Sequence, residues 1–239
     1  MLIKTICILA STLILSLAHA NDNDAIKGDL YKMTIKGHKP LKYEEAKREL
    51  FGNLHLKEDS QGFYLEDLYC KKIYRKGMGP GALPNQDVLN CEHTWPQSKF
   101  TSRFPEKTQK ADLHHLFPTD SRANSTRGNH DFAEVKTNEN LKPGCESSQS
   151  GESINDKGDH NFFEPPADHK GNVARALFYF SVRYKIEIDL SQETFLRKWH
   201  AEDPVDAEEM ARNDAIEKLQ GNRNPFIDNP EYVNAVSNF

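Results

Sequence analysis

Cysteine is scarce in this chain, and its spacing argues against a zinc site. The sequence has 4 cysteines, and no pair has the Cys-x-x-Cys spacing typical of structural zinc sites. The His-Glu-x-x-His pattern of zinc peptidases is also missing. We therefore expect neither a zinc finger nor a peptidase of that class.

Long apolar runs are missing after the first residues. Residues 6–17 are mainly apolar, follow Lys4 and precede the small-residue site Ala18-His19-Ala20. This pattern is typical of a secretory signal peptide cleaved after Ala20, and the run is too short to remain as a membrane span. We expect a periplasmic or extracellular monomer with no membrane partner. Residues 21–239 contain no low-complexity linker or internal repeat, which indicates a single domain.

An excess of positive charge is missing too. Removal of Lys4 with the signal peptide leaves 30 Lys and Arg residues against 36 Asp and Glu residues, a net charge of −6 with histidine neutral. Net charge says little about the local field. Acidic residues concentrate at 202–209, whereas basic residues form three groups, which predicts a basic cleft on an acidic body. The groups are Lys71, Lys72, Arg75 and Lys76; Lys99, Arg103, Lys107 and Lys110; and Lys170, Arg175, Arg183 and Lys185.

The cysteines that remain after cleavage are Cys70, Cys91 and Cys145. An oxidising destination permits one disulfide and leaves one thiol, and three pairings are open. We favour a bond through Cys91, because it would brace the backbone beside Glu92.

Three polar residues indicate a chemistry. Glu92 stands beside His93, and Asn124 follows His93 by 31 residues within an Arg-rich polar run. Carboxylate and amide oxygens suit a hard ion such as Mg²⁺, which keeps several waters and accepts a phosphate oxygen as a further ligand. A neutral imidazole can take a proton from an attacking water near neutral pH. Together they form parts for metal-assisted phosphodiester cleavage.

The local geometry raises a difficulty for Glu92 and His93. Neighbouring residues on a regular strand point to opposite faces, so both could not serve one site in the middle of a strand. Pro96 gives a reason for the strand to end here. We therefore place both residues at a strand end or bulge. Residues 116–118 are predicted to form the returning strand, with Asn124 near the start of a short helix.

Five motifs in order carry a resemblance that covers most of the mature chain. It resembles the endonuclease I family of secreted and periplasmic nucleases, whose catalytic core is the ββα-metal finger, also called the His-Me finger. The motifs are Glu-His-x-x-Pro at 92–96, Asp-Leu-His-x-Leu-x-Pro at 112–118, Asn-x-x-Arg-x-Asn at 124–129, Pro165-Pro166 with Lys-Gly-Asn-Val-Ala-Arg at 170–175, and Gln-Gly-Asn-Arg-Asn-Pro-Phe at 220–226.

The resemblance implies a role for individual residues. His93 is the general base, Glu92 and Asn124 hold the metal, and Arg127 belongs to the same catalytic region. Mg²⁺ is the implied cofactor, with Mn²⁺ or Ca²⁺ as alternatives, and cleavage leaves 5′-phosphate ends. The expected partner is DNA, with RNA left open. Residues expected to contact the substrate are His115, Asn129, Arg103, Arg175 and Lys99.

The chain also departs from the family pattern. His115 stands where some relatives carry asparagine, and Lys110 stands where some carry an acidic residue near the metal. Several relatives carry an arginine on the loop between the two strands, and Arg103 is the only arginine on the corresponding loop here.

Each of these assignments has an alternative. Asn124-Ser125-Thr126 also fits an N-glycosylation acceptor. We expect His114 to make a structural hydrogen bond and Trp95 to pack in the core. At the level of function, one alternative is a secreted nucleic-acid-binding protein that has lost catalysis. Another is a metal-dependent hydrolase of a different substrate.

Apolar spacing predicts the surrounding elements. Helices are expected over 43–54, from residue 173 to at least 184, and over 191–199. A last helix is expected with Asp203 as N-cap, Pro204 at its first position and Gly221 after its end. Residues 136–168 are rich in Gly, Ser, Asn and Asp, which indicates a long loop with at most short strands. The predicted fold class is α+β, with the ββα-metal finger embedded among helices.

Overall fold

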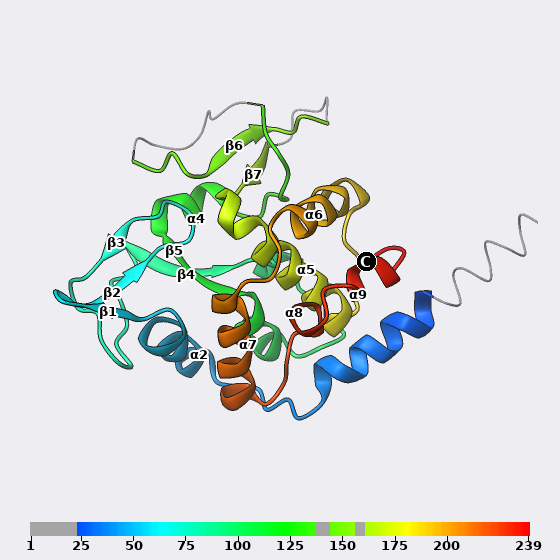
Figure 1. Ribbon diagram of the computed structural model, residues 1–239, viewed down its shortest axis with the longest axis horizontal. Coiled ribbons are helices and arrows are strands. Elements are labelled where there is room, and N and C mark those ends of the chain that lie inside the picture. The colour runs from blue at the N-terminus through cyan, green and yellow to red at the C-terminus, as the bar shows by residue number, and fades with distance from the viewer. Residues whose placement is uncertain (1–22, 137–143, 156–160) are drawn as a thin grey trace, which may run out of the picture.

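The computed structural model describes residues 23–136, 144–155 and 161–239. Within these ranges the chain combines small antiparallel sheets with helices, which confirms the α+β class (Figure 1). The predicted signal peptide at 1–20 lies outside the described residues. No described helix is long and apolar enough to cross a membrane.

The N-terminal part contains two helices and a small sheet. Residues 23–35 are helical. The helix predicted over 43–54 is present as α2 (Tyr43–Glu49), which continues into the π-helical segment η1 (Leu50–Leu54). An antiparallel sheet follows, formed by β1 (Lys57–Asp59), β2 (Gly62–Glu66) and β3 (Ile73–Tyr74).

A two-stranded sheet and a short helix form the centre of the molecule. Strand β4 (Leu89–His93) pairs antiparallel with β5 (Leu116–Asp120), with Glu92 opposite Phe117 and His93 opposite Leu116. Helix α4 (Ser121–Arg127) follows β5 directly. The connection between the strands contains η2 (Gln97–Lys99), α3 (Glu106–Lys110) and η3 (Leu113–His115).

The β4–β5 pair lies between two apolar clusters. Leu89 and Cys91 of β4 pack in a cluster with residues of α2 and β5. Trp95, just after β4, and Ala123 of α4 belong to the larger cluster around α5 (Lys170–Tyr184). Trp95 stacks on Phe180 with ring centroids 5.2 Å apart, so the prediction that it packs in the core is confirmed. Packing on both sides fixes where β4 ends.

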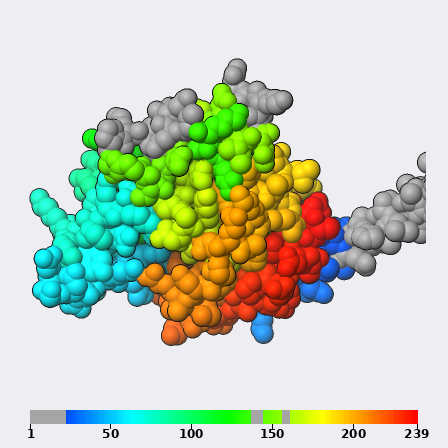
Figure 2. Space-filling model, turned by 45° about the horizontal axis from the view of Figure 1, so that its top comes forward, coloured from blue at the N-terminus to red at the C-terminus, as the bar shows by residue number. Residues whose placement is uncertain are grey.

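The C-terminal half is mainly helical. Helix α5 and the helix predicted over 191–199, observed as α6 (Leu190–Glu202), pack against each other. They are followed by α7 (Ala207–Gln220), α8 (Pro225–Asp228) and α9 (Tyr232–Ala235), and η4 (Ala167–His169) precedes α5. In Figure 2 the C-terminal segment with α8 and α9, red, lies toward one end of the molecule, and the β1–β3 sheet, cyan, lies at the other.

The predicted start of the last helix was wrong. Asp206 caps α7 by accepting a hydrogen bond from the Glu209 backbone N–H. Asp203 instead follows the end of α6, and its carboxylate accepts from the Gly171 N–H of α5 at 2.7 Å. The local sequence pattern predicts that Asp203 caps a helix, but its side chain makes a tertiary contact with α5 instead. Gly221 ends α7 in the left-handed region, as predicted.

The disulfide also differs from the favoured pairing. Cys70 is bonded to Cys145, and Cys91 is a buried free thiol. Cys91 shares a strand face with Leu89, which directs it into the apolar cluster beside α2. Between residues 136 and 168 the described parts contain the short strands β6 (Gln149–Glu152) and β7 (Asn161–Glu164), which pair antiparallel.

Candidate active site

Glu92 and His93 are the last two residues of β4, as predicted. Their side chains leave opposite faces of the strand, and the chain then turns into η2 after Pro96. Both residues therefore lie at the strand end that the sequence predicts, with the carboxylate and the imidazole on opposite faces of the strand.

The Glu92 carboxylate is buried and held by two neighbours. It is 2% exposed, and its Oε1 accepts a hydrogen bond from Tyr69 Oη at 3.1 Å. Arg127 Nη1 lies 2.8 Å from the same oxygen. Burial raises the pKa of Glu92, and the charge of Arg127 and the hydrogen bond from Tyr69 oppose that rise. Both contacts end on Oε1, so Oε2 accepts no hydrogen bond from the described part of the chain.

Arg127 connects α4 with the end of β4. It is 2% exposed, and besides Glu92 it donates to the carbonyl oxygens of His93, at 2.9 Å, and Thr94, at 2.6 Å. Its guanidinium also lies over the Phe132 ring. Arg127 is therefore in the predicted region. Its bonds go to protein groups, which fits a role in holding Glu92 and the strand end.

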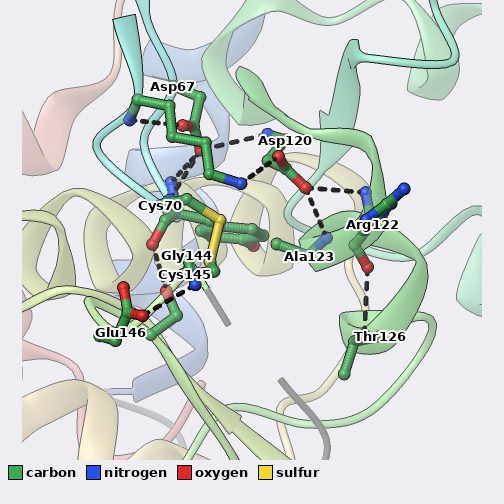
Figure 3. Close-up of a disulfide and its surroundings, with 12 residues drawn as sticks. Asp67, Cys70, Asp120, Arg122, Ala123, Thr126, Gly144, Cys145 and Glu146 are labelled. Atoms are coloured by element: carbon green, nitrogen blue, oxygen red, sulfur yellow. Dashed lines mark hydrogen bonds and ion pairs between the residues drawn. A yellow bond between two sulfur atoms is a disulfide. The ribbon is translucent and has the colours of Figure 1, made fainter. Parts of the chain in front are cut away.

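Asn124 lies on the middle turn of α4 and faces β4. Its amide nitrogen donates to Asn90 Oδ1 at 2.6 Å, and Asn90 shares a strand face with Glu92. Within the described residues no donor reaches Asn124 Oδ1. Asp120 caps this helix by accepting from the N–H groups of Arg122 and Ala123, as Figure 3 shows. Helix α4 thus brings Asn124 beside the face that carries Glu92.

The hydrogen bonds of His93 define its tautomer. Nε2 lies 3.2 Å from the carbonyl oxygen of Lys110, which can only accept, so Nε2 carries the hydrogen. Nδ1 then accepts from the Gln97 amide nitrogen at 3.4 Å. Burial is the main cause that lowers the pKa of His93, to about 3, and the neighbouring His115 adds to it. The imidazole is therefore neutral, with its lone pair on Nδ1.

Aromatic rings surround His93 and fix its orientation. Tyr43, Phe100 and His115 lie with ring centroids 5.6, 6.4 and 5.4 Å from the His93 ring. His115 is 0% exposed, and its Nε2 is bonded to the Gln109 carbonyl oxygen. A side chain this buried does not reach a substrate. The expected substrate contact of His115 is therefore corrected to packing against the His93 ring. His114 makes the predicted structural hydrogen bond, to the Asn222 carbonyl.

Three of the other residues expected to contact the substrate are exposed. Asn129 is exposed just beyond α4. Lys99 is partly exposed on η2 and forms an ion pair with Asp131 at 2.6 Å, and the exposed Arg103 donates to the Lys185 carbonyl oxygen. Arg103 is therefore directed toward the end of α5.

Arg175 does not line a cleft. It is 0% exposed and forms two hydrogen bonds with the Glu209 carboxylate, at 2.8 and 2.6 Å. A further bond to the Asp203 carbonyl joins α5 to the end of α6. The expected substrate contact is corrected to a structural ion pair, because its charge is neutralised inside the helical layer.

The oxygens at this site fit a hard divalent ion. The described residues contain no group of three His, Cys, Asp or Glu side chains arranged to hold a metal. Glu92 Oε2, a carboxylate oxygen, and Asn124 Oδ1, an amide oxygen, accept no hydrogen bond within residues 23–136, 144–155 and 161–239. Mg²⁺ needs only one or two such ligands, because waters and phosphate oxygens complete its shell.

Sequence reasoning missed three residues that contact the predicted site. Asn90 is bonded to Asn124, Gln97 to His93 Nδ1, and Tyr69 to Glu92. Two of them had a usable signal. Asn90 lies two residues before Glu92 on the same strand face, and Gln97 follows Pro96 in the turn after His93. Tyr69 precedes Glu92 by 23 residues, and nothing local links the two.

Comparison with known proteins identifies the family of this chain. The sequence profile of the family described as Endonuclease I matches residues 20–231. The chain belongs to the endonuclease I family. It is therefore a nucleic-acid-hydrolysing endonuclease, and divalent-metal dependence is a general property of this family.

Relatives in the endonuclease I family act on both kinds of nucleic acid. An extracellular ribonuclease of Bacillus subtilis (strain 168) is 34% identical over 240 residues, which cover 92% of this chain and 76% of the relative. One of Bacillus amyloliquefaciens is 32% identical over 92% of this chain and 76% of its own length. An extracellular deoxyribonuclease of Aeromonas hydrophila is 31% identical over 50% of this chain and 49% of its own length.

Proposed function

We propose that this chain is a secreted or periplasmic, divalent-metal-dependent endonuclease whose catalytic core is a ββα-metal finger formed by β4, β5 and α4. Residues 1–20 act as a signal peptide, and residues 21–239 form one nuclease domain. The observation that carries the proposal is the arrangement at the end of β4. Glu92 Oε2 and Asn124 Oδ1 accept no hydrogen bond from the described residues, Asn124 is bonded to Asn90 on the strand face of Glu92, and the next residue, His93, is a neutral imidazole.

In this proposal Glu92 and Asn124 hold the ion. The preferred ion is Mg²⁺, with Mn²⁺ and Ca²⁺ as alternatives, because both ligands are hard oxygens. When bound, the ion neutralises charge that develops on the phosphate and on the departing oxygen. Arg127 positions the carboxylate by pairing with Oε1, which directs the other oxygen away from the protein donors.

His93 acts as the general base. The Lys110 carbonyl keeps the hydrogen on Nε2, so the lone pair lies on Nδ1. Nδ1 can take a proton from an attacking water when that water replaces the long hydrogen bond from Gln97, 3.4 Å in this structure. Attack on the phosphorus with departure of the 3′ oxygen leaves a 5′-phosphate and a 3′-hydroxyl. Such hydrolysis needs no 2′-hydroxyl.

We propose that both DNA and RNA are substrates. Similarity to a ribonuclease over 92% of this chain and to a deoxyribonuclease over 50% of it supports this breadth. Backbone phosphate contacts carry no sequence information, so cleavage has little sequence specificity. Asn129, just beyond α4, and Lys99 of η2 are the proposed substrate contacts, with Arg103 farther along the connection between β4 and β5.

A plasmid-nicking assay with and without chelator tests the proposal. We expect nicking with Mg²⁺, none after chelation, and recovery when Mg²⁺ is restored. Glu92→Gln and Asn124→Ala should each raise the Mg²⁺ concentration needed for half-maximal rate. Binding of DNA without nicking at any metal concentration would support the inactive binding protein instead. Turnover that persists in chelator would overturn the metal mechanism, and titration curves that overlay the wild type would reject these ligands.

His93→Ala tests the base separately from the metal. The rate of nicking should fall by about 10² to 10⁴, because a general base of this kind contributes that factor. Mn²⁺ binding should persist, since His93 is not a proposed ligand. Purified His93→Ala with a near wild-type rate would reject His93 as the base.

A further inference from the structure

The segment 67–72, which follows β2, lies against the proposed metal site. Tyr69 of this segment reaches Glu92, and Lys72 donates to Asp120, the cap of α4, at 2.8 Å. One loop thus contacts the carboxylate proposed as a ligand and the start of the helix that carries Asn124. Figure 3 shows Asp67, Cys70 and Asp120 close together in this region.

Asp67 gives the loop a fixed shape. Its carboxylate is 0% exposed and accepts hydrogen bonds from four backbone N–H groups. Three come from the loop itself and the fourth from Asp120 at the end of β5. The donors are Tyr69 at 3.0 Å, Cys70 at 2.7 Å, Lys72 at 2.8 Å and Asp120 at 3.1 Å. The Asp67 carboxylate therefore connects the backbone of the loop to the backbone of β5 at Asp120.

Tyr69 is held on all sides. It is 0% exposed, and its ring lies 4.6 Å from the Phe163 ring. Its carbonyl oxygen accepts from Ser148 Oγ at 2.7 Å, and the next residue, Cys70, is bonded to Cys145. Among the described residues, the one hydrogen-bond partner of the phenol is Glu92 Oε1. A buried, immobilised donor of this kind fixes the direction of the carboxylate that it contacts.

We propose that Tyr69 is a positioning residue for the metal site. Its hydroxyl fixes Glu92 Oε1 together with Arg127, so that Oε2 is presented to the ion. The inference rests on the proposed function, because it takes Glu92 as a ligand. Tyr69 itself touches neither ion nor substrate. Loss of its hydroxyl therefore weakens ion binding without removing a ligand.

The test measures Mn²⁺ affinity directly, by electron paramagnetic resonance of free Mn²⁺, in the full-length mature protein. Tyr69→Phe should raise the Mn²⁺ dissociation constant by about tenfold, the lower end of the effect of removing a group that orients a metal ligand. Its nicking rate should approach that of the wild type once Mn²⁺ is saturating.

Tyr184→Phe is the matched control. Tyr184 is also 0% exposed and its hydroxyl donates to a buried carboxylate, Asp112, at 2.8 Å, away from the proposed ligands. Both variants lose the same kind of hydrogen bond, so a general loss of stability would affect both. Mn²⁺ affinity should stay at the wild-type value in Tyr184→Phe.

The outcomes separate the inference from the proposed function. Weaker Mn²⁺ binding in Glu92→Gln but unchanged binding in Tyr69→Phe would overturn the role of Tyr69 alone. Unchanged binding in Glu92→Gln would overturn the metal site and the inference with it. If Tyr69→Phe does not fold, Ser148→Ala, which frees the Tyr69 carbonyl, should raise the Mn²⁺ dissociation constant. Wild-type affinity in Ser148→Ala would then contradict the proposal.

Discussion

At the scale of single residues, burial decides what the Glu92–Arg127 pair does. Each side chain is 2% exposed, so neither charge is solvated. Arg127 also donates to two carbonyl oxygens of the strand end, whereas its buried Nε has no hydrogen-bond partner among the described residues. A buried pair of this kind is sensitive to the removal of one partner, because the other charge is left uncompensated.

Arg127→Met should therefore destabilise the fold strongly. We expect the free energy of unfolding to fall by about 3–5 kcal/mol, measured by urea denaturation. Lys99→Met is the control, since it removes an ion pair with Asp131 that is more than a third exposed and worth about 0–1 kcal/mol. Equal losses in the two variants would show that burial is not the deciding factor.

At the scale of elements, the end of α7 is fixed by a close approach between two glycines. Gly221 has φ +82°, and a Cβ atom there would lie 2.2 Å from the Gly37 carbonyl oxygen. A Cβ atom on Gly37 would meet the Gly221 carbonyl oxygen at 2.4 Å. The helix therefore ends where the backbone of the N-terminal region passes directly against it.

Two glycine-to-alanine substitutions should have opposite signs. Gly221→Ala should destabilise by more than about 1 kcal/mol, because its backbone conformation is strained for alanine and the space is filled. Gly28→Ala should stabilise by about 0.5–1 kcal/mol, because Gly28 lies within the helix 23–35 and nothing lies within 4 Å of an added Cβ. Thermal unfolding of the two variants checks this. A shift in the same direction for both would contradict it.

At the scale of the whole molecule, six of the twelve residues in the predicted basic groups form ion pairs with described acidic residues. Of the three groups predicted to form a basic cleft, the members in ion pairs with acidic side chains include Lys71, Lys72, Arg75, Lys99, Lys170 and Arg175. A chain with a mature net charge of −6 thus has fewer available cations than its composition indicates. Binding of nucleic acid must depend on a few exposed groups near β4 and α4, among them Lys99, whose ion pair with Asp131 is exposed enough for a phosphate to replace the carboxylate.

The salt dependence of DNA binding measures how many of these groups contact a phosphate. The affinity of non-cleaving His93→Ala for duplex DNA should fall with salt, by about 0.9 in logarithmic slope for each phosphate contact. Lys99→Gln in that background should reduce the slope by about one contact. Lys32→Gln should not, because Lys32 lies on the helix 23–35, far from α4 in Figure 1. An unchanged slope in the Lys99 variant, measured by fluorescence anisotropy, would remove it from the interface.

Buried histidines should make the fold sensitive to mild acid. Burial lowers the pKa of His114 and His115 to about 4 and that of His169 to about 3. Between pH 6.5 and 5 the unfolded chain takes up protons that the folded chain excludes, so stability falls with pH by up to about 1.4 kcal/mol per unit for each histidine. The raised pKa of Glu92 acts in the opposite direction at the lower end of this window.

His169→Gln tests this contribution. The variant should show a shallower dependence of the free energy of unfolding on pH between 6.5 and 5, by up to about 1.4 kcal/mol per unit. The lowered pKa of Asp112 does not interfere. The stability that this carboxylate contributes is lost only as the pH falls below its pKa in the unfolded chain, near 3.8. A slope that equals the wild-type slope would mean that His169 titrates normally in the folded protein.

The sequence by itself determined the element types, the end of β4 and the family. These follow from local information: apolar spacing for α5 and α6, alternation and Pro96 for β4, and the order of the motifs. Glu92, His93 and Asn124 were identified because their residue types limit the chemistry that they can perform.

Only the tertiary structure decided which side chains are enclosed. Arg175 and Lys99 both look like surface cations in the sequence, yet Arg175 is sealed against Glu209, 34 residues away, while Lys99 stays partly exposed. The disulfide partner of Cys70 and the contact of Tyr69 with Glu92 depend equally on distant segments. Burial and pairing are properties of packing between such segments, and no local pattern encodes them.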